Sequence, residues 1–294
     1  MILVTGATGF IGGHFLNKLH DIYSKEKVVL LSSKTHKNYQ TIIYNEGILN
    51  EEVMEQLQQL SPQIVFHIGG YTPKATIEAN DINGSFSNIA FTKNLLSCCK
   101  ITTNFIFLST LDVYENVAIA INEATSTLPV SLYGYSKLFC EKMVESWTKQ
   151  NNAIIQVLRV GHVYGPGEEK YTKFLPVTLK KMLNNETLEI WGDGSDLRSF
   201  IHVEDVCDFI LAAAKLTAYK GPVNLCGDES NSLLSIITKI AEAVNIEPAI
   251  IYKDRVGTVR HLLFDNAKRK QLLGEEKISF IQGAAEEYKY LAQL

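Results

Sequence analysis

The sequence has no basic run and no long apolar segment, and each absence excludes a class of protein. Lysine and arginine number 28 against 32 acidic residues, which gives a net charge of −4. We therefore expect no nucleic-acid partner and no binding to an anionic membrane. The most apolar stretch, 206–214, contains Asp208 and is far shorter than the ~20 residues that span a bilayer. The chain opens on a strand-like segment, 1–5, and we expect no signal peptide.

Cysteine is also scarce, with five residues in the chain. The only close pair is Cys98 and Cys99, and no CxxC motif occurs. An odd, scattered set indicates free thiols in a reducing compartment, without a disulfide framework or a metal site. We therefore expect a cytoplasmic protein. Its 294 residues, 46% of them hydrophobic, are enough for one large domain or two small ones.

What the chain does have is an alternation of short apolar segments with segments of helical spacing. Such strands, separated by helices, indicate a parallel sheet covered on both faces, which is a doubly wound α/β (Rossmann) fold. The expected strands are 2–4, 28–31, 42–44, 63–68, 105–108 and 154–158, and the expected helices are 10–23, 53–60, 83–100 and 132–149.

The pattern changes after residue 165, where we expect a smaller C-terminal α/β lobe that binds substrate. We predict a dinucleotide-binding domain over 1–165 and a mainly substrate-binding lobe over 166–294, with the segment near 200–216 returning to the first domain. The expected elements of this second part are helices at 174–184, 203–216, 233–244 and 284–294, and strands at 188–191, 223–225 and 248–252.

A glycine-rich turn follows the first expected strand directly. A strand, a tight glycine turn and a helix place a diphosphate on the helix N-terminus, where missing side chains let the backbone approach it. We therefore predict dinucleotide binding at this turn. The predicted cofactor-binding residues are Gly6, Thr8, Gly9, Phe10, Ile11 and Gly12.

The end of the second strand predicts which dinucleotide is bound. An acidic residue there would hold the ribose 2′-hydroxyl and repel a 2′-phosphate, but the chain carries Ser32, Ser33 and Lys34 instead. Two hydroxyls and a positive charge favour NADP(H), with NAD(H) as the alternative. The competing interpretation is that Lys34 is a solvated loop lysine.

A second group of residues predicts chemistry. Tyr133 and Lys137 are four positions apart on an expected helix, so one helical face presents both. An ammonium beside a phenol lowers the phenol's pKa, which would suit Tyr133 for proton exchange with a sugar oxygen. Thr110, at the end of the fifth strand, could hold the same oxygen.

With these motifs the sequence resembles the extended short-chain dehydrogenases/reductases of the NAD-dependent epimerase/dehydratase type, in the branch that modifies nucleotide sugars. The resemblance covers nearly the whole chain. The motifs that carry it are TGATGFIG at 5–12, LSTLDVYE at 108–115, YGYSK at 133–137, RVGHVYGPG at 159–167, WGDGSDLRSFIHVEDV at 191–206, VNLCG at 223–227 and DRVGTVRH at 254–261.

The resemblance implies roles for individual residues. It makes Thr110, Tyr133 and Lys137 the catalytic set, and it adds Tyr133 and Lys137 to the cofactor site, where Lys137 holds the nicotinamide ribose. It places Arg198 and Arg255 at the diphosphate of the nucleotide sugar, where guanidinium groups bind well; structural salt bridges are the alternative. The remaining residues of the expected substrate site, besides Thr110 and Tyr133, are Ser109 and His162. His162 stands where many members have asparagine, and it either contacts the substrate phosphates or packs in the core.

Departures from the family pattern narrow the activity. Dehydratases carry Asp-Glu after the catalytic threonine, whereas this chain has Leu111 and Asp112, which weighs against dehydration. The preferred interpretation is NADPH-dependent reduction of a nucleoside-diphosphate 4-keto-6-deoxyhexose at C4. The alternatives are a UDP-sugar 4-epimerase with tightly held NAD, and a cofactor-sensing protein without activity. The segment 71–74 is expected to face nicotinamide and sugar, without an assigned role.

The resemblance also implies a homodimer. The expected helices 83–100 and 132–149 would pair with their copies in a second chain. Phe86, Phe91 and Leu138 are apolar positions that could extend this interface, with burial in the core as the alternative.

Overall fold

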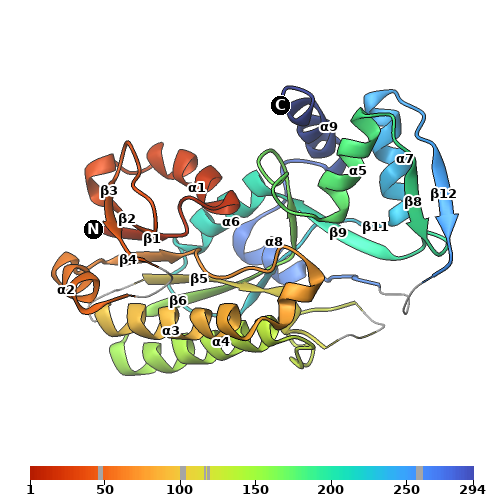
Figure 1. Ribbon diagram of the computed structural model, residues 1–294. Helices are drawn as coiled ribbons and strands as arrows, with labels where there is room; N and C mark the ends of the chain where they lie inside the picture. Colours follow the sequence, from red (N-terminus) through yellow and green to blue (C-terminus); the bar gives the residue numbers. More distant parts are fainter. Residues whose placement is uncertain (46–48, 100–103, 116, 118–119, 256–260) are drawn as a thin grey trace.

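A computed structural model describes the chain except for residues 46–48, 100–103, 116, 118–119 and 256–260 (Figure 1). Its centre is a seven-stranded sheet in which all the neighbouring strands run parallel. The strands are β1 (Ile2–Thr5), β2 (Val28–Ser32), β3 (Gln40–Ile43), β4 (Ile64–His67), β5 (Asn104–Thr110), β6 (Ile154–Val160) and β10 (Val223–Leu225). Their order is β10-β6-β5-β4-β1-β2-β3, so the direction of winding reverses between β1 and β4.

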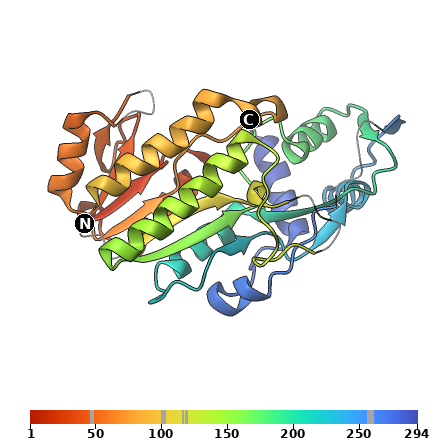
Figure 2. The same ribbon diagram turned by 90° about the horizontal axis from the view of Figure 1, so that it is seen from below.

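Helices cover both faces of this sheet, as the sequence predicts (Figures 1 and 2). On one face α1 packs against α6, and α6 packs against α8; α2, α3 and α4 lie on the other face, with α3 and α4 side by side. These helices are α1 (Phe10–His20), α2 (Glu51–Leu60), α3 (Ile82–Cys98), α4 (Leu132–Asn151), α6 (Val203–Ala213) and α8 (Ala267–Leu273).

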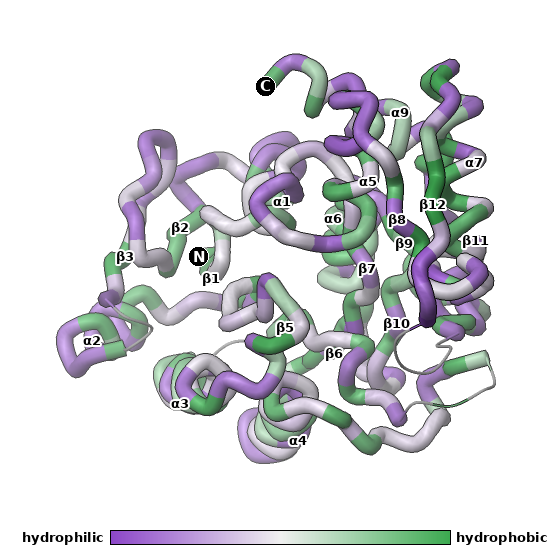
Figure 3. The backbone as a smooth tube through the Cα atoms, turned by 45° about the vertical axis from the view of Figure 1, so that its right-hand side comes forward, coloured by the Kyte–Doolittle hydropathy of each residue, from purple (hydrophilic) through white to green (hydrophobic). Residues whose placement is uncertain are grey.

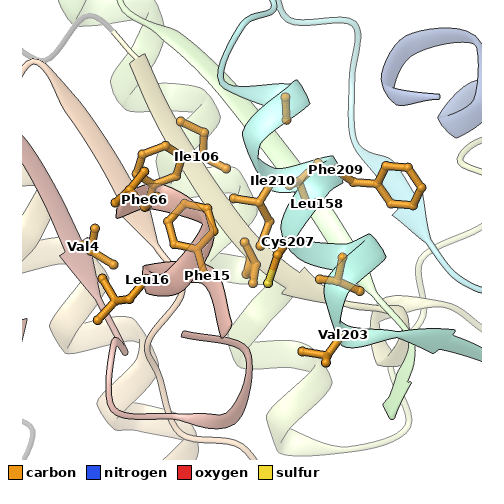
Figure 4. Close-up of a cluster of buried hydrophobic side chains, with 14 of the residues drawn as sticks. Val4, Phe15, Leu16, Phe66, Ile106, Leu158, Val203, Cys207, Phe209 and Ile210 are labelled. Carbon is orange, nitrogen blue, oxygen red and sulfur yellow. The ribbon is translucent and has the colours of Figure 1, made fainter. Parts of the chain in front are cut away.

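The strands are continuously apolar because each supplies side chains to two cores. Val4 and Leu30 belong to the cluster under α1 and α6, where Phe15 lies against Phe66 with 4.7 Å between the ring centres (Figure 4). Their neighbours point to the opposite face and pack under α2, α3 and α4. A one-sided sheet would instead alternate apolar with polar residues.

The rest of the chain builds a second group of elements around its own apolar cluster. Two small sheets have the orders β11-β9-β7 and β12-β8. The elements are β7 (His162–Tyr164), β8 (Leu188–Trp191), β9 (Leu197–His202), β11 (Ser230–Ser232), β12 (Ile250–Lys253), α5 (Phe174–Leu183), α7 (Leu233–Val244) and α9 (Phe280–Leu291). Between them, α6 and β10 join the seven-stranded layer. A division of the chain near residue 165 stays a prediction.

Several elements differ from those predicted. The strands β7, β9 and β11 and the helix α8 have no counterpart among the expected elements, because each is short or rich in polar residues. The last helix begins at Phe280, earlier than expected, since the Ser279 side chain caps it and Gln282 returns the bond in a capping box. The expected end of α3 at Lys100 lies outside the described residues. Among the described residues no helix has the length and apolar character to cross a membrane.

The helices α3 and α4 mix hydrophobic and hydrophilic residues along their length (Figure 3). Some of the hydrophobic ones point outward, and Phe86 is 65% exposed. The other two residues predicted for a dimer interface are placed differently. Phe91 is buried in the core under α3, and Leu138 packs against a small cluster with Val113 and Ile121. The alternative, burial in the core, holds for Phe91, which is 7% exposed; Leu138 is half-buried, and its place in an interface stays a prediction.

Candidate active site

The glycine turn after β1 is tight enough to exclude side chains at two positions. Gly6 has φ +73°, and a Cβ there would lie 2.4 Å from the Cα of Gly69, which follows β4. A Cβ on Gly12 would lie 2.0 Å from the carbonyl oxygen of Gly6. The turn therefore sits where the carboxyl ends of β1 and β4 meet, at the reversal of strand order, which is where open α/β sheets bind ligands.

The helix that follows this turn begins without a side-chain cap. Gly9 is its N-cap residue and makes no side-chain hydrogen bond, so the amides of the first turn lack a partner from a cap. Thr8 and Gly9 are exposed, Phe10 is buried, and Ile11 is half-buried against the core. Uncapped amides beside glycine backbone fit the diphosphate of a dinucleotide.

At the end of β2 the structure separates the three predicted residues. Ser32 is 3% exposed, and its Oγ accepts a hydrogen bond from the backbone amide of Lys34 at 3.2 Å. Ser33 and Lys34 are exposed. The Ser32 oxygen thus shapes the turn, and Ser33 and Lys34 are the residues open to a ligand.

Thr110 ends β5 and caps a short 3₁₀ helix, Leu111–Val113. Its Oγ1 accepts from the backbone amide of Asp112 at 3.2 Å and donates to the Asp112 carboxylate at 3.3 Å. The strand end therefore presents a hydroxyl whose orientation is fixed by the turn.

Tyr133 lies in the first turn of α4, where the Ser131 side chain caps the helix. Its phenol is buried, and the side chains of Thr72 and Thr110 lie close enough to act on its pKa. The sequence predicts that Lys137 lowers the pKa of Tyr133, and this prediction is wrong. Burial raises the pKa of Tyr133, and the Asp112 carboxylate raises it further.

The position of Lys137 explains that difference. Its ammonium lies 4.5 Å from the centre of the Phe107 ring and is buried, with 6% of the residue exposed. Burial lowers the pKa of Lys137 to about 8, although Cys140 and Glu141 act to raise it. A buried ammonium over an aromatic ring is partly stabilised by the ring, and it has lost its hydration.

Two loops meet near the side chain of Tyr133. Tyr71 and Thr72 follow β4, and the Tyr71 ring stands edge-on to Tyr133 with 6.4 Å between centres. From the other half of the molecule, Tyr171 lies 6.4 Å from the Phe10 ring, and Thr172 donates a hydrogen bond to the Lys74 carbonyl at 3.1 Å.

The segment 71–74 therefore gains a role that the sequence alone did not assign. Thr72 is a third hydroxyl at the phenol of Tyr133, next to that of Thr110. Tyr171 and the neighbouring Lys173 were not singled out from the sequence. Their only signal is their position shortly after the Gly-Pro-Gly segment 165–167.

The predicted substrate residues are placed unevenly. The Ser109 hydroxyl donates to Glu141 at 2.5 Å inside the core, because successive strand residues point to opposite faces. The prediction that Ser109 contacts substrate is corrected accordingly. His162 is half-buried on β7, with its ring 5.7 Å from that of Phe200.

The two predicted arginines lie at the second group of elements. Arg198, on β9, is half-buried and donates to the Leu197 carbonyl at 2.8 Å. Arg255 bridges two carboxylates, those of Asp193 at 2.9 Å and Asp196 at 3.0 Å. The alternative interpretation of Arg255, a structural salt bridge, is thus what the structure shows. Part of its motif, 256–260, lies outside the described residues.

Metal chemistry has no visible site in the part of the chain that the structure describes. No group of three or more histidine, cysteine, aspartate or glutamate residues there could hold an ion. The chemistry that the described site can carry is proton exchange at the phenol of Tyr133, beside the hydroxyls of Thr72 and Thr110.

Comparison with known proteins shows the family to which the chain belongs. The model of the NAD dependent epimerase/dehydratase family matches residues 2–226. An uncharacterized UDP-glucose epimerase of Bacillus subtilis is 28% identical over 313 residues, covering 100% of this chain and 98% of that protein. A dTDP-4-dehydro-6-deoxy-D-allose reductase of a Streptomyces species is 28% identical over 256 residues, covering 80% of this chain and 78% of the other.

A trifunctional UDP-glucose 4,6-dehydratase, 3,5-epimerase and reductase of Arabidopsis thaliana is 26% identical over 317 residues. The match covers 96% of this chain and 46% of the plant protein. The chain therefore spans about half the length of that relative.

Two solved structures are similar over their whole length. The UDP-glucose 4-epimerase of Thermotoga maritima, solved with UDP-glucose, has a TM-score of 0.88 and 27% identity, covering 99% of this chain and 98% of that one. The UDP-glucuronic acid 4-epimerase of Bacillus cereus, solved with its nucleotide sugar and NAD, has a TM-score of 0.85 and 27% identity, with 99% of both chains covered.

Proposed function

We propose, from the premise that the chain belongs to the NAD dependent epimerase/dehydratase family, that it transfers hydride between a nicotinamide cofactor and C4 of a nucleoside-diphosphate sugar. The observation that carries the proposal is the meeting of Thr110 and Tyr133 hydroxyls at the carboxyl end of β5, with Lys137 one helical turn further along α4. The glycine turn after β1 supplies the cofactor site of the same proposal.

The residues divide the work as follows. The bound nicotinamide supplies or accepts the hydride. Tyr133 exchanges a proton with the sugar oxygen, and Thr110 and Thr72 orient that oxygen by hydrogen bonds. Lys137 holds the cofactor ribose and places a positive charge near the phenol. Holding the reacting atoms in line is the main contribution of such a site.

The first candidate activity is 4-epimerisation of a UDP-sugar. The two solved structures that are similar over the whole chain are 4-epimerases bound to UDP-sugars, one of them with NAD. An epimerase returns its hydride to the same sugar and therefore keeps its cofactor through each cycle. This candidate predicts turnover without added cofactor.

The second candidate is reduction of a 4-keto-6-deoxyhexose with NADPH. It is supported by the exposed Ser33 and Lys34 at the end of β2, which suit a 2′-phosphate, and by the Streptomyces reductase among the relatives. Leu111 occupies the position of the proton donor that the family's dehydratases use, so we do not propose dehydration.

Substrate binding follows from the same premise. We assign the diphosphate to Arg198 and Arg255, with His162 beside it. Binding would require Arg255 to exchange at least one of its bonds to Asp193 and Asp196 for bonds to the phosphates. The odd, scattered set of five cysteines, all of them buried, supports a reducing compartment such as the cytoplasm.

We also propose a homodimer through α3 and α4. Exposed apolar side chains on both helices support it, since a contiguous patch of this kind usually marks an interface. The residues are Ile82 (71% exposed), Phe86 (65%), Leu132 (40%), Tyr135 (49%) and Phe139 (53%).

One experiment separates the two candidate activities. Purified protein is given UDP-glucose alone, and then a nucleoside-diphosphate 4-keto-6-deoxyhexose with NADPH, and the products are separated by chromatography. UDP-galactose formed without added cofactor supports the epimerase. Stoichiometric loss of NADPH with the keto sugar supports the reductase, and inactivity with a panel of nucleotide sugars would contradict both.

A further inference from the structure

A buried ion pair lies directly behind the catalytic residues. Arg159 on β6 is 3% exposed, and its guanidinium binds both carboxylate oxygens of Glu141 on α4, with Nε–Oε1 at 3.0 Å and Nη2–Oε2 at 2.8 Å. The Ser109 hydroxyl donates to the same carboxylate. On its far side Arg159 donates to the Tyr114 hydroxyl at 2.8 Å, which in turn donates to Asn224 at 2.7 Å.

Together with Ser109, this pair connects β5, β6 and α4, and two of these elements carry the proposed reacting residues. Ser109 on β5 is in register with Arg159 on β6, and the next residue of β5 is Thr110. On α4, Glu141 lies one turn after Lys137 and two turns after Tyr133. The bidentate contact therefore fixes both the rotation of α4 about its axis and its position along that axis, relative to the end of β5 that carries Thr110.

We propose that Glu141 and Arg159 are positioning residues, which hold Tyr133 and Lys137 in catalytic register with Thr110 and keep a negative charge beside the Lys137 ammonium. The proposal rests on the proposed function only in taking Thr110, Tyr133 and Lys137 as the reacting set.

The general energetics of buried ion pairs favour a positioning role for Glu141 and Arg159 over a stabilising role. Replacing a buried ion pair by apolar groups of similar size often leaves stability unchanged or improved, whereas removing one partner is strongly destabilising. A bidentate arginine–carboxylate pair also fixes geometry more tightly than a single bond does. The pair's distinctive contribution is therefore its geometry and its charge.

Within the described residues, few titratable groups besides Glu141 face the ammonium of Lys137. The groups that face its ammonium are Glu141 and Cys140 on its own helix, His67 on β4 and the Phe107 ring on β5. Burial holds the pKa of His67 at about 3, so this ring is neutral. Glu141 is the carboxylate in this set, and its loss would make Lys137 easier to deprotonate.

The test uses a variant that removes the charges without leaving one of them buried alone. In the double variant Glu141→Gln with Arg159→Met, the amide can still accept from Ser109, and Tyr114 can still donate to Asn224. Arg159→Lys keeps the charge but loses the bidentate contact. Lys142→Gln is the control, because Lys142 is 63% exposed on the same helix and pairs only with Glu145 in the described structure.

We expect the double variant to fold with a melting temperature near that of the parent. Its kcat should fall by about 10- to 100-fold, the usual size of a small misplacement of reacting groups, while KM changes little. The alkaline limb of its pH profile should move to lower pH. Arg159→Lys should lower kcat without moving that limb, and Lys142→Gln should change neither. A stable double variant with unchanged kcat and pH profile would overturn the proposal.

NADH binding supplies a readout that does not need turnover. Nicotinamide fluorescence measured against pH reports the protonation of Lys137, because this residue is proposed to hold the cofactor ribose. The weakening of NADH binding at alkaline pH should begin at lower pH in the double variant than in the parent. If no nucleotide sugar reacts, the proposed function fails while this comparison still decides the role of the pair. Identical pH dependence of NADH binding in both proteins would contradict the charge effect.

Discussion

Glu168 and Glu287 bury their carboxyl groups against each other, although they are far apart in the sequence. Each residue is 1% exposed, and none of the four carboxylate oxygens has a hydrogen-bond partner in the described structure. Lys173 Nζ lies 3.9 Å from Glu168, and Glu169 adds a further negative charge nearby. The pair joins the loop that carries Tyr171 to α9, so it connects the candidate active site to the end of the chain.

This pair predicts that stability falls as pH rises. Burial, reinforced for Glu168 by its neighbour Glu287, raises the pKa of both carboxyls above the ordinary value of 4.5. A group with a raised folded-state pKa contributes stability that is complete below its unfolded pKa and is lost as pH rises through the folded value. Glu168→Gln, which stays neutral, should melt higher than the parent at alkaline pH.

Thermal melts between about pH 5 and pH 9 measure this effect, since ordinary carboxyls are already ionised over that range. The gain should be roughly 2–4 °C for each kcal/mol of recovered stability, and it should vanish at the acid end. Glu247→Gln, at an exposed site, is the control and should melt like the parent throughout. Equal slopes of melting temperature against pH in Glu168→Gln and the parent would refute the raised pKa of the buried Glu168 carboxyl.

The glycine turn predicts a sharp contrast between adjacent positions. Gly12→Ala places a methyl group 2.0 Å from the Gly6 carbonyl oxygen, whereas Gly13→Ala meets nothing within 4 Å. Gly12→Ala should lose cofactor binding and stability, because the turn must open. Gly13→Ala should keep binding and gain roughly 0.5–1 kcal/mol from its helical position. Cofactor titration and denaturant unfolding check both, and normal binding by Gly12→Ala would contradict this view of the turn.

Cofactor choice should follow the end of β2. If Ser33 and Lys34 face a 2′-phosphate, the parent binds NADPH more tightly than NADH, and Lys34→Glu or Ser33→Asp reverses or removes the preference through charge repulsion. Nicotinamide fluorescence gives all the dissociation constants, with Lys37→Glu as an exposed control. A clear preference of the parent for NADH would show that Lys34 is a solvated loop lysine.

The dimer should depend on the outward faces of α3 and α4. Phe86→Asp or Phe139→Asp places a charge in the proposed interface and should yield a monomer, while each chain keeps its fold because both residues are more than half exposed, at 65% and 53%. Ile22→Asp, at a site 50% exposed after α1, is the matched control. Light scattering reads the mass, and a parent that is itself monomeric at micromolar concentration would remove the interface.

The regular elements could be predicted from the sequence because apolar strands and helical spacing leave strong signals. β10 and α7 have the predicted bounds. The short strands β7, β9 and β11 could not be predicted, since their residues include His162, Arg198 and Asn231 and their pairing is with segments distant in the chain.

The residues of the candidate site also divide into those that the sequence predicts and those that it does not. Glycine spacing and the Tyr133–Lys137 interval are local, so the sequence reveals them. The partners Thr72, Tyr171 and Arg159 come from other elements, and only the fold brings them to β5 and α4. The environment of Tyr133 shows the limit: a local argument from Lys137 predicts a lowered pKa, whereas burial and Asp112 raise it.

The central claim is that Tyr133 exchanges the proton while hydride moves between nicotinamide and sugar. Its most direct test is single-turnover absorbance of reduced nicotinamide, with enzyme, cofactor and a panel of nucleotide sugars, in the parent and in Tyr133→Phe. The parent should show a change in reduced nicotinamide with at least one sugar, and the variant should be slower by about 10²–10⁴-fold, the usual share of a general acid, with cofactor affinity unchanged. A Phe variant that reacts at the rate of the parent would contradict the account.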